Sequence, residues 1–186
     1  THVDELQGAQ PITNFSMRSV VTPTLSTATS LAVNITPFSE MVVAAAGRET
    51  GGLTDANLTK AKTTIKDLVK FDPMSTEVAS KDGLTTESSD ETKRQLLLLT
   101  AVSSLVKKQA DAGTLGCEAD TTALKCVVDK LSDAADAKTL ALKIGSGEST
   151  TNLGQLLSQQ VTSLVGESGS FNGDFSGAEI DELKKP

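Results

Sequence analysis

The chain has 186 residues, of which 38% are hydrophobic and only 3% aromatic, and it contains neither Trp nor Tyr. Its formal net charge is −7 and its lysine pairs are too short to form a basic patch, so we exclude nucleic-acid binding, which needs clustered Lys and Arg. The scarcity of aromatic rings also argues against a stacking platform for single strands. No run approaches the roughly 18 apolar residues of a transmembrane helix. The length suits one domain with an appendage.

Residues 1–35 are predicted to form an N-terminal arm with one or two β-strands. The runs 15–21 and 31–35 alternate weakly between apolar and polar side chains, a pattern typical of strands. Two short strands bury too little surface to be stable alone, so we expect them to lie on the helical body or to complete a sheet outside this chain. The side chains that would carry this strand pairing are Phe15, Met17, Val20, Leu31, Val33 and Ile35.

A change to helical periodicity is expected at Thr36. Thr36 is a favourable N-cap and Pro37 suits the first helical position, and the helix should end before Gly51–Gly52. A second helix is expected after the cap residue Thr54 and should end before Asp72–Pro73. The apolar residues that recur at helical spacing in these two helices are Phe38, Met41, Val42, Ala45, Leu58, Ala61, Ile65, Leu68 and Val69.

The run from Ser88 to Gly113 is the segment around which the rest of the chain should pack. It contains four consecutive leucines, Leu96–Leu99, so about one turn has no polar face and should be covered on all sides. Ser88 and Glu91 match a capping box that would open this helix, and Gly113 suits its C-terminal cap.

Two more helices are expected in the second half of the chain. Asp120 is positioned to cap the first, and Thr150 or Thr151 to begin the second, which Gly166 would close. Between them, residues 140–144 fit either a strand or a short helix. The predicted inward-facing side chains are Ala123, Leu124, Val127 and Leu131 in the first helix and Leu153, Leu156, Leu157, Val161, Leu164 and Val165 in the second.

Residues 167–186 are expected to form a Gly/Ser-rich linker and a short terminal helix that a Ser176–Glu179 capping box would open. Residues 172–177 also resemble the start of a calcium-binding EF-hand loop, but the twelfth position is Leu183 instead of Glu, which favours a turn over weak calcium binding. The predicted fold class is mainly α: a helical bundle of about five longer helices over residues 36–166, with an N-terminal extended or β segment.

Cys117 and Cys126 are the most informative pair in the sequence. Cys126 would lie about six residues, roughly 9 Å, along its helix, and the three residues from Cys117 to Asp120 can span roughly 10 Å. The lead-in can therefore fold back, and we predict a disulfide, with two buried thiols or half of a metal site as alternatives. A disulfide favours an oxidising compartment. With no other Cys and one His, no metal site is predicted.

The sequence shows no catalytic constellation. His2 is the only histidine and lies in the N-terminal arm, whereas Ser–His or Cys–His catalysis needs an imidazole ordered in the body of the fold. The 24 acidic residues leave a paired-carboxylate mechanism open, but their positions in caps and on polar helix faces favour solvation. We predict a non-catalytic protein without a cofactor.

Residues Val33–Glu40 read VNITPFSE, within a longer run from Ser26 to Gly47. This run resembles secreted or lipid-anchored surface proteins of betaproteobacteria, in which the last strand of an immunoglobulin-like (carboxypeptidase-regulatory-like) β-sandwich continues directly into a helix. The segment from Leu115 to Asp129 is also similar to their helical part. The resemblance implies a surface location and this architecture, and it implies no activity. Only 35 residues precede Thr36, too few for a complete sandwich.

These features predict an exported bacterial protein that is extracellular or at the cell surface, with the periplasm as an alternative and a lipid anchor upstream of Thr1 as an option. We expect a structural or interaction role with a protein partner or a second copy, using the N-terminal strand segment. The alternative is a binding module for an apolar small ligand or peptide in a groove beside Leu96–Leu99. An enzyme that works through carboxylates alone ranks third.

Overall fold

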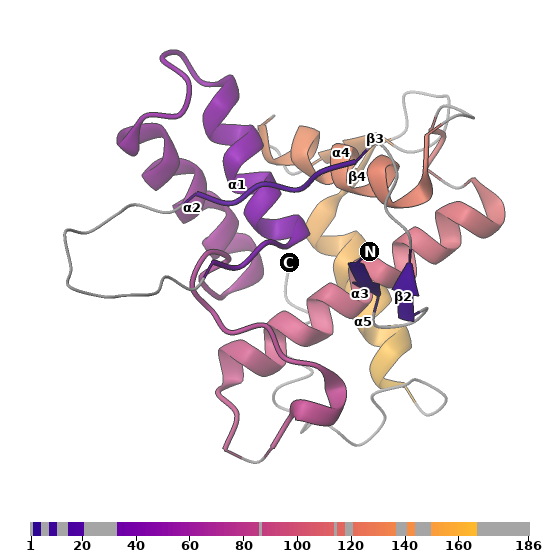
Figure 1. The fold of residues 1–186 in the computed structure, drawn as a ribbon. Coiled ribbons are helices and arrows are strands. Elements are labelled where there is room, and N and C mark those ends of the chain that lie inside the picture. The colour runs from indigo at the N-terminus through magenta and orange to yellow at the C-terminus, as the bar shows by residue number, and fades with distance from the viewer. Residues whose placement is uncertain are drawn as a thin grey trace.

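A computed structural model describes residues 2–4, 8–10, 15–20, 33–85, 87–113, 115–117, 121–136, 141–143 and 150–166. Over these residues the chain is mainly helical, as predicted (Figure 1). The helices are α1 (Pro37–Arg48), α2 (Asp55–Val69), α3 (Asp90–Ala112), α4 (Ala123–Asp136) and α5 (Leu153–Val165), with a 3-10 turn at Lys81–Gly83. Two antiparallel pairs of short strands join β1 (His2–Asp4) to β2 (Gly8–Gln10) and β3 (Ala141–Lys143) to β4 (Thr150–Asn152).

The helices enclose one hydrophobic core with α3 at its centre. Helix α1 packs against α2 and α4, and α3 packs against α4 and α5 (Figure 1). The four leucines Leu96–Leu99 are all buried, and the rings of Phe38 and Phe71 meet edge to face with centroids 5.7 Å apart. The prediction that the four-leucine turn is covered on all sides is confirmed. None of the helices in the described part of the chain is both long and apolar enough to cross a membrane.

The predicted starts of α1 and α2 are confirmed. The Thr36 hydroxyl accepts from the main-chain N–H of Ser39 (3.2 Å), and the Ser39 hydroxyl accepts from that of Thr36 (2.9 Å), a reciprocal capping box. The Thr54 hydroxyl accepts from Asn57 N (3.3 Å) at the start of α2.

The predicted cap of α3 is wrong by one residue. Ser89 is the N-cap, and its hydroxyl accepts from Thr92 N (3.1 Å). The Ser88 hydroxyl instead accepts from Thr85 N (3.0 Å) in the preceding turn. The Glu91 carboxylate accepts from the hydroxyl of Thr76 (3.2 Å), a contact 15 residues away in sequence that a local pattern does not reveal. Gly113 closes α3 with a left-handed backbone (φ 58°), as predicted.

The ends of the last two helices also differ in detail from the predictions. The predicted cap of α4, Asp120, lies outside the described residues; the hydroxyl of Thr122 accepts from Lys125 N (3.3 Å) at the first turn. Helix α5 begins at Leu153 because residues 150–152 pair with residues 141–143 as β4 and β3, and β-branched Thr150 and Thr151 suit a strand. The predictions for residues 167–186, the terminal helix and the calcium-like loop, fall outside the described residues.

The N-terminal strands lie elsewhere than predicted. The pair β1–β2 falls in residues 2–10, whereas residues 15–20 and 33–35, the described parts of the two predicted strands, pair with no strand in the described part of the chain. Residues 15–20 form an extended trace that crosses α1 (Figure 1). An extended run forms a β-ladder only with a neighbouring strand, whereas residues 15–20 are bound by side chains of α1.

Candidate functional site

The Arg18 segment, residues 15–20, lies across the first turn of α1 and is held there by Ser39 and Glu40, which we call the Ser39–Glu40 pair. Glu40 Oε2 accepts from the main-chain N–H of Arg18 (2.6 Å), and the Ser39 hydroxyl donates to the Arg18 carbonyl (3.0 Å). The Arg18 guanidinium donates to Glu40 through Nε (3.1 and 3.2 Å) and Nη2 (2.5 Å). One residue of the segment is therefore bound through both its main chain and its side chain.

The two charged side chains of this contact differ in their exposure to solvent. The side chain of Glu40 is only 10% exposed, whereas that of Arg18 is 56% exposed. The hydrogen bond with Glu40 raises the pKa of Arg18 above its ordinary value and outweighs a smaller opposing effect of burial. Glu40 also lies in the first turn of α1, where the helix dipole favours a negative charge. A carboxylate so deeply buried needs its cationic partner.

The rest of the Arg18 segment alternates as an edge strand does. Phe15, Met17 and Ser19 are half-buried, and Ser16 and Arg18 are exposed. The Ser19 hydroxyl lies 4.0 Å from the sulfur of Met74. The main-chain groups of Met17 and Ser19 form no hydrogen bond to another described residue. Successive residues of an extended chain direct these groups to opposite edges, so α1 holds one edge and no described residue pairs with the other.

A second extended stretch leads into α1 and is anchored on the segment after α2. The side-chain amide of Asn34 donates to the carbonyl of Thr76. The fully buried Gln95 of α3 donates to the carbonyls of Thr76 (3.1 Å) and Glu77 (2.6 Å) with its amide oriented to satisfy both. On either side of Asn34, Val33 and Ile35 are 40% and 57% exposed.

The structure thus places the predicted strand-pairing residues in two groups. Phe15, Met17 and Val20 are half-buried in the Arg18 segment, and Val33 and Ile35 are exposed before α1. Leu31 lies outside the described residues. The role of the strand segment in pairing stays a prediction, because within the described ranges no strand pairs with it.

Sequence reasoning missed the residues that hold these stretches. The sequence placed Ser39 and Glu40 only within the VNITPFSE run around a predicted helix start, and Gln95 only within the helix predicted between Ser88 and Gly113. The available signal for Gln95 was a polar residue directly beside four leucines, since a buried amide must find hydrogen-bond partners. Nothing in the sequence indicates that Arg18 would contact Glu40.

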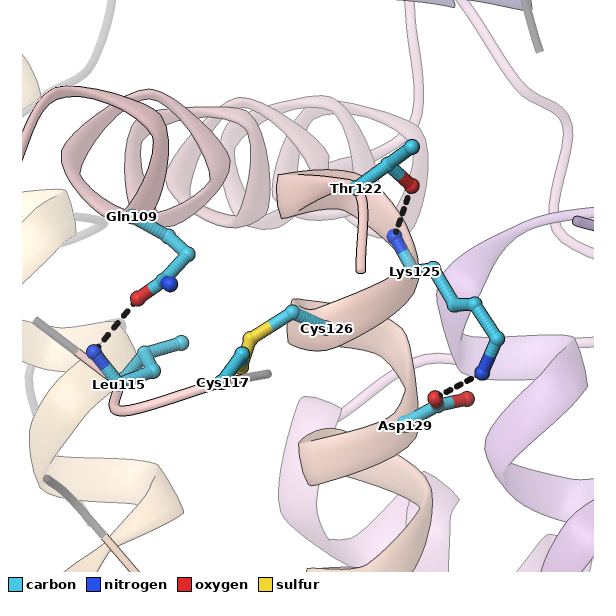
Figure 2. Close-up of a disulfide and its surroundings, with 7 residues drawn as sticks. All are labelled: Gln109, Leu115, Cys117, Thr122, Lys125, Cys126 and Asp129. Atoms are coloured by element: carbon cyan, nitrogen blue, oxygen red, sulfur yellow. Dashed lines mark hydrogen bonds and ion pairs between the residues drawn. A yellow bond between two sulfur atoms is a disulfide. The ribbon is translucent and has the colours of Figure 1, made fainter. Parts of the chain in front are cut away.

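The predicted cysteine pair is brought together as a disulfide, with Cα atoms 5.9 Å apart (Figure 2). Cys126 is buried in α4, and Cys117 comes from the lead-in after α3. The same lead-in is tied to the end of α3 because Leu115 N donates to Gln109 Oε1 (2.6 Å) (Figure 2). Within the described ranges, no group of three or more His, Cys, Asp or Glu residues is placed to hold a metal ion.

The side chains Leu96–Leu99 are at most 7% exposed. An apolar ligand beside α3 would therefore have to displace core contacts to reach them. The binding-module alternative stays a prediction without a described surface to support it.

No family model, curated protein or solved structure matches this chain.

Proposed function

We propose that this chain is a non-catalytic exported bacterial protein with a structural or interaction role at the cell surface, a subunit of an extracellular assembly. In this role the Arg18 segment adds as a strand to a neighbouring copy or to another protein. The proposal keeps the extracellular or surface location that the sequence resemblance implies. The disulfide supports it, since such bonds persist in oxidising compartments.

The observation that carries the proposal is the edge of the Arg18 segment with which none of the described residues pairs. One edge is bonded to α1 at Arg18, so the segment is held in an extended conformation before any partner arrives. Strand addition uses main-chain hydrogen bonds along a free edge, and a preformed strand loses less entropy on binding. The exposed side chains of Val33 and Ile35 would contribute apolar contacts beside it.

Two matched serine substitutions test this role. Ser19→Pro removes an N–H on the unpaired edge, whereas Ser16→Pro removes one on the edge that faces α1. Both substitutions keep the segment extended, because proline favours this conformation in itself and in the preceding residue.

Mass should be measured by light scattering over a range of concentrations. We expect the wild type and Ser16→Pro to associate and Ser19→Pro to remain at the 19.3 kDa of one chain. A wild type that stays at the mass of one chain at every concentration would contradict the proposal, and so would equal association of all three proteins.

A further inference from the structure

The Ser39–Glu40 pair has the properties of a binding site for an arginine in an extended peptide. Glu40 accepts from both the main-chain N–H and the guanidinium of Arg18, while Ser39 donates to the carbonyl of the same residue. A peptide with any other side chain at this position would lose the contacts of the guanidinium, and lysine carries its donors on one nitrogen, without the planar pair of nitrogens through which Arg18 contacts Glu40. The contact therefore selects a residue type as well as an extended backbone.

The two halves of the contact belong to different parts of the chain. The receiving half is built into the helical body: Ser39 is fully buried and is oriented by its capping box with Thr36, so it is in place whether or not Arg18 is bound. The bound half lies in the Arg18 segment, and the 12 residues 21–32 join it to Val33. Fully extended, twelve residues can span at most roughly 40 Å. This span exceeds the radius of gyration of roughly 16 Å expected for a chain of this length, so the connection is long enough to carry the Arg18 segment to a neighbouring copy.

We propose that the Ser39–Glu40 pair also binds the Arg18 segment of a second copy of this chain, so that two copies exchange their segments. This rests on the proposed function, names its partner as a second copy, and adds a contact on the edge of the segment that faces α1. The exchanged contacts are identical to those within one chain, so exchange neither gains nor loses contacts. Its only cost in free energy is the loss of the high effective concentration that the segment has at the site of its own chain. Glu40, whose side chain is 10% exposed with its own Arg18 bound, would lose its cationic partner when that segment leaves, and an unpaired carboxylate at this position favours capture of another copy's arginine.

Charge exchange across the contact tests the proposal. In Arg18→Glu, two carboxylates repel each other within the chain and between identical copies. In Glu40→Arg, two guanidinium groups do the same. When the two variants are mixed, each segment meets an oppositely charged partner only on the other protein. We expect each variant alone to have the mass of one chain and the mixture to form a 1:1 complex of twice that mass.

The double variant R18E/E40R is the matched control, because it restores opposite charges within one chain. A guanidinium at position 40 cannot accept the main-chain N–H of residue 18 and is disfavoured by the helix dipole, so the double variant should unfold at a lower denaturant concentration than the wild type. It should nevertheless associate as the wild type does, without a second variant in the mixture. If the wild type associates through the edge that Ser19→Pro blocks, yet the mixed single variants form no 1:1 complex, segment exchange is overturned while the proposed function stands. If the wild type does not associate and the mixture still pairs, the proposed function fails and the exchange contact is supported.

A peptide measurement covers the case in which the buried arginine of Glu40→Arg prevents folding. The probe is a synthetic peptide of residues 14–21, labelled with a fluorophore and added to the Arg18→Ala chain, whose Ser39–Glu40 pair is intact. We expect saturable 1:1 binding by fluorescence anisotropy, and at least tenfold weaker binding when the peptide carries Lys in place of Arg18. Equal binding of both peptides, or no binding of either, would overturn the proposal.

Discussion

Asp72 links the turn after α2 to the side of that helix. Its Oδ1 accepts from Met74 N (2.9 Å), and its Oδ2 lies 2.7 Å from Lys62 Nζ. Burial, the largest single effect, raises the pKa of this carboxyl, but the hydrogen bonds from Lys62, Met74 and Ser75 and the charge of Lys62 together outweigh it. The pKa of Asp72 therefore lies below its ordinary value.

This shift predicts how acid affects stability. A lowered pKa in the folded state means that ionised Asp72 stabilises the fold above the unfolded-state pKa of about 3.9, and that this contribution is lost as pH falls through the folded-state pKa. We expect Asp72→Asn to be less stable than the wild type at pH 7 and the difference to shrink as pH falls below about 4. Urea unfolding at several pH values measures it. Lys62→Met removes the cationic partner of Asp72 and should also reduce the pH dependence of the free energy of unfolding. If that free energy varied with pH in the same way in all three proteins, the lowered pKa of Asp72 would be contradicted.

The hydrogen-bond partners of single side chains were harder to predict from the sequence than the helices. Thr36 and Thr54 could be assigned as caps because a cap contacts the N–H three residues on, within the same local pattern. Glu91 was assigned to a capping box but bonds to Thr76, and Glu40 bonds to Arg18, 22 residues earlier. Such partners depend on the tertiary fold, which a local pattern does not contain.

At the level of elements, apolar periodicity was sufficient for all five helices and insufficient for the strands. Leucine and valine spacing marks a helix without knowledge of its neighbours, because the buried stripe repeats within the helix itself. A strand needs another strand, so the alternation of residues 15–20 produced an extended segment on α1 instead of a ladder. Residues 150–152 formed a strand because residues 141–143 were available to pair with them.

Helix α3 supplies a direct test of core packing. Leu97 is fully buried at the centre of the helix, so Leu97→Ala should lower the free energy of unfolding by about 2–5 kcal/mol, through lost apolar contact and the cavity that remains. Leu53→Ala is the matched control, since Leu53 is 52% exposed and should lose no more than about 0.5 kcal/mol. Urea denaturation followed by circular dichroism measures both. Equal losses would show that α3 is not the centre of the core.

In the whole molecule, side chains of the helices bind the extended stretches, a role that neighbouring strands have in a β-sheet. Ser39 and Glu40 bind the Arg18 segment, and Gln95 binds the stretch after α2, which in turn accepts from Asn34. The helical body thus holds two extended stretches near the N-terminal end of α1 without pairing them into a sheet. Among the described residues this arrangement leaves one edge of the Arg18 segment without a partner, and this is the edge that the proposed strand addition would use.

The disulfide joins a non-helical stretch to a helix by a covalent bond, and its reduction gives a prediction for the stability of the whole fold. Cys117 and Cys126 are nine residues apart in sequence, and closing so short a loop should stabilise the protein by about 2.5 kcal/mol in the chain-entropy treatment. We expect a reducing agent to lower the free energy of unfolding of the wild type by about this amount. The double variant C117A/C126A should show the lower value with and without the agent.

Thiol labelling of the reduced protein must accompany the measurement, so that an unchanged stability cannot reflect incomplete reduction. Fully reduced wild type with an unchanged free energy of unfolding would show that the bond contributes nothing to the fold. A loss on reduction would mean that the lead-in to α4 depends on an oxidised pair for its full stability, because Cys126 anchors it inside the core. The protein would then be most stable in the oxidising compartment that its proposed surface role requires.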